Sequence, residues 1–129
     1  MSKKRAFVSF DYDNDVRYRD LLIGQSKNPI SPIEIYDWSL RYAFDSKWKT
    51  QCRDRIKRTH VLIQLIGKRT YEADGAVWEV KCAKEENIPV FGVYINKSDK
   101  GSIPSSLNGS PIIEWTWDGI ADMVNKLAR

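Results

Sequence analysis

The sequence predicts an α/β fold, a three-layer sandwich in which helices cover both faces of a central five-stranded parallel sheet. Short apolar runs alternate with amphipathic runs along the 129 residues, in the order β-α-β-α-β-α-β-α-β. Neither a repeat nor a low-complexity tract nor a linker interrupts this pattern, so we expect a single domain over residues 1–129. Right-handed crossovers between parallel strands then favour the strand order 2-1-3-4-5.

Each strand is expected from a short apolar run bounded by turn-forming residues. The first follows the basic start of the chain, the second follows a loop with two prolines, and the third is the strongest apolar run. The fourth and fifth flank a polar segment, 96–110, which is typical of a surface loop. In chain order, the expected strands are 5–10, 33–36, 60–66, 89–95 and 112–115.

Each helix is expected from an apolar stripe or from residues that favour helix ends. Asp13 or Asn14 is expected to cap the first helix and Gly24 to end it, and Asp45 or Ser46 is expected to cap the second. The stripes are Trp48, Cys52 and Ile56 in the second helix and Ile120, Met123, Val124 and Leu127 in the last. In chain order, the expected helices are 15–23, 46–58, 75–86 and 117–128.

The charge pattern narrows the function classes. The net charge is +4, but the basic residues are spread along the chain, with one local cluster that acids interrupt. This cluster reads either as a solvated helix face or as a surface for an anion or a partner. Binding of nucleic acid would rest on charge alone, so we do not expect it. The cluster comprises Arg53, Arg55, Lys57 and Arg58.

Other residue types argue for a cytoplasmic protein without a metal site. His60 is the only histidine, which makes a histidine-rich metal site or a Ser-His-Asp triad improbable, and no cluster has metal-ligand spacing. Cys52 and Cys82 lie among apolar residues without motif spacing and read as reduced core thiols. The longest apolar stretch, 60–66, is too short for a membrane span, and no signal-peptide pattern is present.

The strand order points to the place where a ligand would bind. Open parallel sheets bind ligands outside the carboxyl ends of their strands, here between the first and third strands. The residues that follow Phe10, Tyr36 and Ile66 are therefore the candidates. Asp11 directly follows a buried strand, whereas Asp13 has the alternative role of a helix cap.

Glu79 is the most informative single residue. On the helix expected over 75–86, Ala76, Val80 and Ala83 share one face, and Glu79 lies at the edge of that apolar arc. A carboxylate there loses solvation, which raises its pKa and strengthens its hydrogen bonds. The alternative is a partly exposed glutamate at the edge of the helix. Trp38, in an irregular segment, reads equally as a stacking platform, a partner contact or a core residue.

Familiar proteins with the same strand order do not fit these positions. A response-regulator receiver needs an aspartate where the third strand ends in Ile66 and Gly67, and a lysine after the fifth strand. A flavodoxin needs a hydroxyl-rich phosphate loop where this chain has acidic residues after the first strand. Neither a G-x-G-x-x-G nor a G-x-x-x-x-G-K-[ST] motif occurs.

Two motifs resemble a known family. The run Arg-Ala-Phe-Val-Ser-Phe-Asp-Tyr-Asp-Asn-Asp over 5–15 is similar to the opening of TIR-like domains of the ThsB type, from the bacterial Thoeris anti-phage system. The run Val-Leu-Ile-Gln-Leu-Ile-Gly-Lys-Arg-Thr-Tyr over 61–71, followed by Trp78, Glu79 and Val80, resembles the same family. The resemblance covers about 5–95, and it implies a flavodoxin-like, TIR-like fold.

The resemblance also implies an activity. TIR enzymes of this kind cleave NAD+ between nicotinamide and ribose, and ThsB-like members release a cyclic ADP-ribose isomer that activates a separate effector. The family's catalytic glutamate matches Glu79, which follows Trp78. NAD+ is then a substrate, and no resident cofactor is expected. The expected nucleotide contacts are Phe10, Asp11, Asp13, Trp38, Ser39, Gly67 and Trp78.

Two classes of function remain open at this point. One is an NAD-cleaving signalling enzyme, whose partners are NAD+ and a downstream effector that responds to a nucleotide signal. The other is a non-catalytic TIR-like interaction module that signals by self-association. Assembly into a homo-oligomer is compatible with both, and neither needs a membrane.

Overall fold

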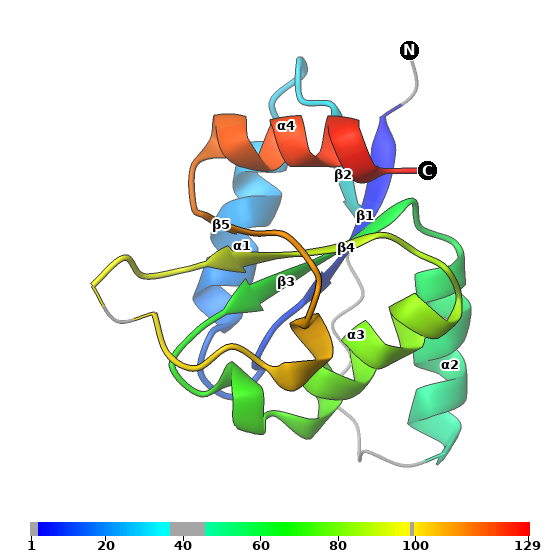
Figure 1. The fold of residues 1–129 in the computed structure, drawn as a ribbon. Coiled ribbons are helices and arrows are strands. Elements are labelled where there is room, and N and C mark those ends of the chain that lie inside the picture. Colours follow the sequence, from blue (N-terminus) through cyan, green and yellow to red (C-terminus); the bar gives the residue numbers. More distant parts are fainter. Residues whose placement is uncertain (1–2, 37–45, 99) are drawn as a thin grey trace.

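The computed structural model describes residues 3–36, 46–98 and 100–129, and it confirms the expected α/β architecture. Five parallel strands form one sheet in the order β2-β1-β3-β4-β5, as in flavodoxin-like and TIR-like folds (Figure 1). The strands are β1 Lys4–Ser9, β2 Ile33–Tyr36, β3 Val61–Ile66, β4 Val90–Tyr94 and β5 Ile112–Glu114. The α-helices are α1 Val16–Ser26, α2 Ser46–Lys57, α3 Asp74–Glu85 and α4 Trp117–Leu127.

Helices cover the sheet on both faces and divide the core in two. Helices α1 and α4 lie on one face and α2 and α3 on the other (Figure 1). Alternate residues of each strand point to opposite faces, so Phe7 packs toward α2 and α3 while Ala6 and Val8 pack toward α1 and α4. Strand β3 is buried at all six positions, as expected for a central strand of a parallel sheet.

The turn after β1 differs from the expectation. Asp13 and Asn14 do not cap α1, which begins after Asp15, and no capping bond from the Asp15 side chain is seen within the described chain. The Asp11 carboxylate instead accepts hydrogen bonds from the Asp13 amide (3.2 Å) and the Asn14 side chain (2.5 Å). The helix begins at Val16, with Asp15 rather than Asp13 or Asn14 at its N-cap position. It also continues past Gly24 to Ser26.

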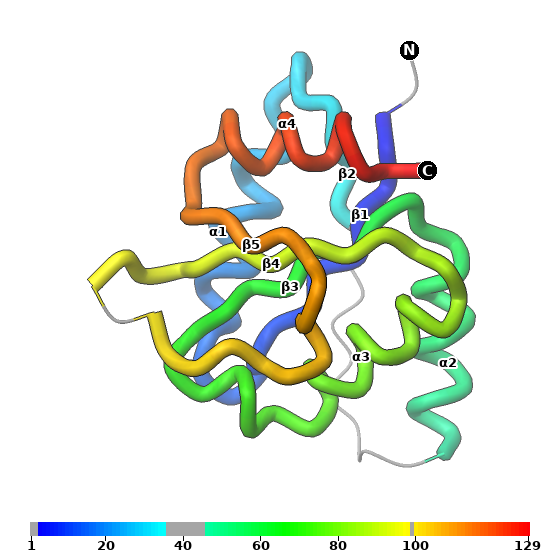
Figure 2. The backbone as a smooth tube through the Cα atoms, in the orientation of Figure 1, coloured from blue at the N-terminus to red at the C-terminus, as the bar shows by residue number. Residues whose placement is uncertain are grey.

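The segment between β4 and β5 is more than the surface loop that its composition suggested. It contains a 3-10 helix, η2 (Ser105–Leu107), which lies beside α3 and β4 (Figures 1 and 2). Leu107 is 1 % exposed, and its side chain approaches Gly92, where an added Cβ would lie 3.2 Å from Leu107 Cδ1. A glycine in β4 thus leaves room for this return of the chain. A second 3-10 helix, η1 (Thr70–Glu72), lies between β3 and α3.

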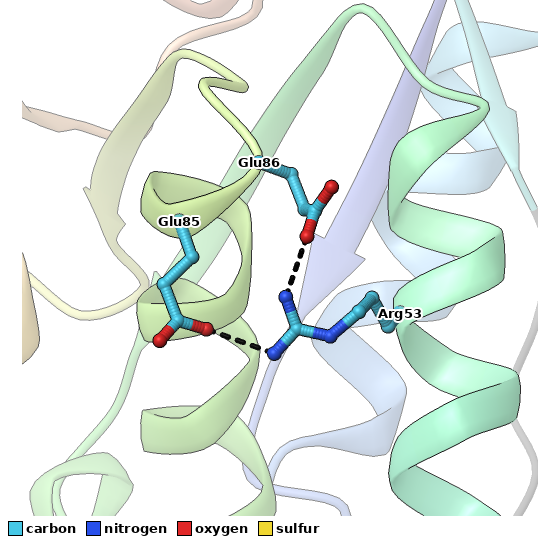
Figure 3. Close-up of polar contacts among 3 residues, drawn as sticks. All are labelled: Arg53, Glu85 and Glu86. Carbon is cyan, nitrogen blue, oxygen red and sulfur yellow. Dashed lines mark hydrogen bonds and ion pairs between the residues drawn. The ribbon is translucent and has the colours of Figure 1, made fainter.

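Helices α2 and α3 are joined by an ion-pair clamp. The Arg53 guanidinium on α2 binds Glu86 through Nη1 (2.6 Å) and Glu85 through Nη2 (2.8 Å), as Figure 3 shows. Trp48 and Trp78 pack beside it with ring centroids 5.4 Å apart. One member of the basic cluster therefore serves a contact inside the fold. Among the described residues, none of the helices has the length and apolar character needed to cross a membrane.

We expect Arg53→Met to lower the free energy of unfolding by ~1 kcal/mol, because two carboxylates lose one partly buried cation. Urea denaturation followed by circular dichroism measures the change. Arg58→Met is the matched control, since Arg58, the residue after α2, pairs with Asp54 of that helix and both side chains are more than half exposed. Equal losses for the two variants would contradict a special role of the clamp.

Candidate functional site

Glu79 lies on α3 with its carboxylate turned toward the carboxyl end of β1. Ser9 Oγ donates a hydrogen bond to Oε1 at 2.7 Å, and Cys52 Sγ on α2 lies 3.6 Å from Oε2 as a weak donor. The residue is partly buried, and its carboxylate lies between β1, α2 and α3. Burial raises the pKa of Glu79 to about 8, and the bonds from Ser9 and Cys52 oppose that rise. The group thus has the perturbed ionisation typical of functional carboxylates.

Ser9 is bound in turn by a buried polar residue, Gln64, which the sequence analysis did not identify as part of the site. Gln64, in the middle of β3, donates through Nε2 to Ser9 Oγ (3.1 Å) and to the main-chain oxygen of Ala76 on α3 (2.9 Å). A signal was available, because Gln64 is the one polar residue in the buried run Val-Leu-Ile-Gln-Leu-Ile. Buried amides need partners, so such a residue marks a polar contact beneath the sheet surface.

Asp11 shapes the turn at the end of β1. It is 4 % exposed, and besides the two carboxylate bonds its main-chain oxygen accepts from the amides of Asn14 (3.2 Å) and Asp15 (2.8 Å). Asp13 is exposed at the outside of this turn. The described geometry therefore gives Asp11 a structural role beside any contact with a ligand.

Phe10 points away from the Glu79 carboxylate. Its ring stacks on Tyr12 with centroids 5.7 Å apart, lies 5.5 Å from the Arg19 guanidinium and packs against the α1–α4 core. Phe10 directly follows Ser9, the last residue of β1, and the two side chains lie on opposite sides of the sheet. The structure therefore does not bring these two predicted residues, Phe10 and Glu79, to one point.

Trp78 packs toward α2. Its ring lies 5.4 Å from that of Trp48, and the Arg53 guanidinium lies 5.6 Å above it. Trp78 thus helps to seat α3, the helix that carries Glu79. Trp38 and Ser39, the other predicted contacts, lie outside the described residues.

The backbone at Gly67 lies close to a second buried carboxylate, that of Asp15. An added Cβ at Gly67 would overlap the Asp15 carboxylate, and the Gly67 amide donates to Thr70 Oγ1 at 2.8 Å. Burial, with a smaller effect of the charge on Asp11, raises the pKa of Asp15 to about 6. Asp15 Oδ2 finds no hydrogen-bond partner among the described residues. The sequence reading assigned Asp15 only to the start of a helix.

A shallow cavity opens beside Asp15 on the α1 side of the sheet. Its volume is about 360 Å³, and it lies between the start of α1 and the ends of β3 and β4. It does not reach Glu79, which lies on the opposite face. Within the described parts of the chain, no group of three or more His, Cys, Asp or Glu side chains could hold a metal ion. The lining residues are Asn14, Asp15, Arg17, Tyr18, Lys68, Ile95 and Asn96.

Comparison with known proteins gives a family and a fold. The family model described as "Thoeris protein ThsB, TIR-like domain" matches residues 7–100. No curated protein matches the chain. A conserved protein from Enterococcus faecalis V583 has a similar structure, with a TM-score of 0.69 and 12 % identity, over 97 % of this chain and 99 % of that one. At this identity the likeness concerns the fold alone.

Two further solved structures are more distant. The TIR domains of the activated Roq1 resistosome, which recognises the pathogen effector XopQ, give a TM-score of 0.44 at 9 % identity over 74 % of this chain and 61 % of that one. A 3-dehydroquinate dehydratase-like protein from Bifidobacterium longum gives 0.46 at 19 % identity over 98 % and 95 %. Neither value is high enough to support a functional argument.

We expect Gly67→Ala to lower the free energy of unfolding by ~2 kcal/mol or more, because the new methyl group overlaps the buried Asp15 carboxylate. Gly24→Ala is the control, since a Cβ at Gly24 meets nothing within 4 Å and alanine favours the helix. Gly24→Ala should leave stability unchanged or raise it by ~0.5–1 kcal/mol. Urea denaturation of both variants measures the difference. If Gly67→Ala left the free energy of unfolding unchanged, that result would contradict the close contact between Gly67 and the Asp15 carboxylate.

We expect stability to fall as pH rises from 5 to 8, and Glu79→Gln to reduce this fall by at least ~1 kcal/mol. The pKa of Glu79 is about 8 in the folded chain and near 4.5 when unfolded. The folded state therefore holds a proton that the unfolded state releases, and it loses stability across this interval. Asp15 acts in the same direction up to pH 6, so the comparison is between wild type and variant at each pH. If the free energies of unfolding of wild type and Glu79→Gln changed with pH in parallel, the pKa of Glu79 would not be raised in the folded chain.

Proposed function

Because the chain belongs to the family of the Thoeris protein ThsB, TIR-like domain, we propose that it cleaves NAD+ between nicotinamide and ribose, with Glu79 as the catalytic carboxylate. The observation that carries the proposal is the position of Glu79. Its carboxylate is desolvated and oriented by Ser9 at the carboxyl end of β1, the edge where open parallel sheets bind ligands. The family's catalytic glutamate matches the same position.

One carboxylate suffices for this chemistry. The bond between ribose C1′ and the nicotinamide nitrogen breaks, and nicotinamide leaves as a neutral molecule with the bonding electrons. The positive charge that develops on the ribose is stabilised by an ionised carboxylate nearby, and a nucleophile then adds to C1′. The raised pKa of Glu79 describes the unliganded site. A bound cationic pyridinium would favour the carboxylate and so lower that pKa.

Our proposal for the product is supported by the family and not by the geometry. We propose a cyclic ADP-ribose-type nucleotide that activates a partner effector in anti-phage defence. Its formation requires that a group of the nucleotide itself, rather than water, attacks C1′.

A second candidate function has one observation in its favour. Glu79 already has two protein donors, Ser9 and Cys52, so the carboxylate is satisfied without a ligand. A satisfied carboxylate between β1, α2 and α3 is compatible with a structural role in a TIR-like docking module. That module would assemble with partners without releasing nicotinamide.

We expect purified full chain to release nicotinamide from NAD+, with Glu79→Gln lowering the rate by ~100-fold or more, because the amide cannot stabilise positive charge. The rate should rise with pH until Glu79 is ionised, and chromatography of nicotinamide between pH 6 and 9 measures both effects. Glu34→Gln, an exposed glutamate on β2, is the matched control and should behave as wild type.

The same variants should be compared in phage-infected cells, where NAD+ and its cyclic products are quantified together. Release of nicotinamide that is unchanged in Glu79→Gln would remove Glu79 from the mechanism. No release by wild type under either condition, with protection against phage intact in Glu79→Gln, would instead support the docking module.

A further inference from the structure

Gln64 is a polar residue in a place that favours apolar ones. It is fully buried at the centre of β3, and its strand neighbours Ile63 and Leu65 are buried aliphatic residues. An amide in such a position costs free energy unless its polar atoms are paired. Its Nε2 is paired twice, whereas Oε1 has no hydrogen-bond partner among the described residues. The two hydrogen bonds of Nε2 therefore offset part of the free-energy cost of burying the Gln64 amide.

The contact with Ala76 fixes which end of the amide faces Ser9. The Ala76 main-chain oxygen lies 2.9 Å from Nε2 and can only accept. If the amide were flipped, two oxygens would face each other at this distance, which is repulsive. The –NH₂ group therefore points toward α3, and its second N–H is directed to Ser9 Oγ at 3.1 Å.

With the amide in this orientation, the Ser9 hydroxyl donates a hydrogen bond to Glu79 and does not accept one from it. Its oxygen accepts from Gln64, and its single hydrogen has two acceptors in reach, Glu79 Oε1 at 2.7 Å and the Ala76 oxygen at 3.3 Å. The shorter contact ends on a carboxylate, and the Ala76 oxygen is already bound by Gln64. The hydrogen therefore goes to Oε1. When Glu79 carries a proton, that proton lies on Oε2, the oxygen next to Cys52.

We propose that Gln64 is a positioning residue for Glu79: through Ser9 it holds Oε1 as an acceptor and leaves Oε2 as the oxygen that gains and loses the proton. The catalytic consequence rests on the proposed function, in which Oε2, whose protein partner is the weak donor Cys52, is the oxygen that faces the ribose. The hydrogen-bond direction itself does not depend on that function. Without Gln64, the Ser9 hydroxyl can turn to Ala76 or accept from a protonated Glu79.

The test is a double-mutant cycle on the ionisation of Glu79 in the full chain. Gln64→Met, Ser9→Ala and the double variant are compared with wild type, and the Glu79 pKa is read from the carboxyl ¹³C chemical shift. Each single variant should raise this pKa by ~1 unit, because a donor to the charged form is lost or redirected. The double variant should raise it no further than Ser9→Ala alone, since both changes break one chain of bonds.

Two controls separate positioning from packing. Leu65→Met alters the same strand on the opposite face and should leave the Glu79 pKa unchanged, whereas Ser9→Thr retains the hydroxyl and should restore it. Among the residues that the structure describes, Cys52 from α2 and Cys82 on α3 are the other titratable groups that interact with Glu79, and their thiol pKa values are raised by burial. Both thiols should therefore remain protonated through the titration.

A second measurement needs no change at Gln64. In wild type, the side-chain amide resonances of Gln64 should titrate with the same midpoint as Glu79, and they should lose that transition in Ser9→Ala. A Gln64→Met pKa equal to wild type, additive shifts in the double variant, or Gln64 resonances that ignore Glu79 would each overturn the proposal. None of these outcomes depends on NAD+ cleavage, so failure of the proposed function is read separately from nicotinamide release.

Discussion

The hydrogen bond from Ser9 to Glu79 joins the end of a central strand to the helix layer, and the arrangement of the site depends on it. Ser9 shares the α2–α3 face with Phe7 because strand residues alternate, and Glu79 is brought over it by α3. The carboxylate cannot move away from β1 without losing its strongest partner. The parallel sheet thus provides more than a scaffold, because it supplies a donor at the edge where ligands bind.

The fold was predictable because its signals are local. Burial on both faces makes β3 a continuous apolar run, and the four-residue spacing of Trp48, Cys52 and Ile56 identifies the buried side of α2. Right-handed crossovers then leave few strand orders to consider. The prediction was wrong at the turn before α1. Asp13 and Asn14 were expected to cap the helix, but the Asp11 carboxylate holds the Asp13 amide and the Asn14 side chain in a turn, and sequence spacing does not show which of several neighbouring polar residues stands at the N-cap.

The candidate site was predictable only in part, for a related reason. The helical wheel places Glu79 at the edge of the apolar arc, and the desolvated carboxylate agrees with that placement. Phe10 was grouped with it as the residue at the end of the first strand, and Trp78 because it directly precedes Glu79. In the structure, however, Phe10 packs on the other face of the sheet, and Trp78 turns toward Trp48. Gln64 and Asp15 escaped notice because their importance lies in contacts between segments distant along the chain, with Ala76 and Gly67 respectively.

The ion pairs of Arg53 reduce the electrostatic effect that the formal net charge of +4 has outside the molecule. A count along the chain treats each cation as free to act on the solvent, but Arg53 faces Glu85 and Glu86, and Arg58 faces Asp54. At these points opposite charges lie within 3.0 Å of one another, so their electric fields largely cancel a few ångströms away. This part of α2 therefore exerts much less long-range attraction on a polyanion than its sequence suggests.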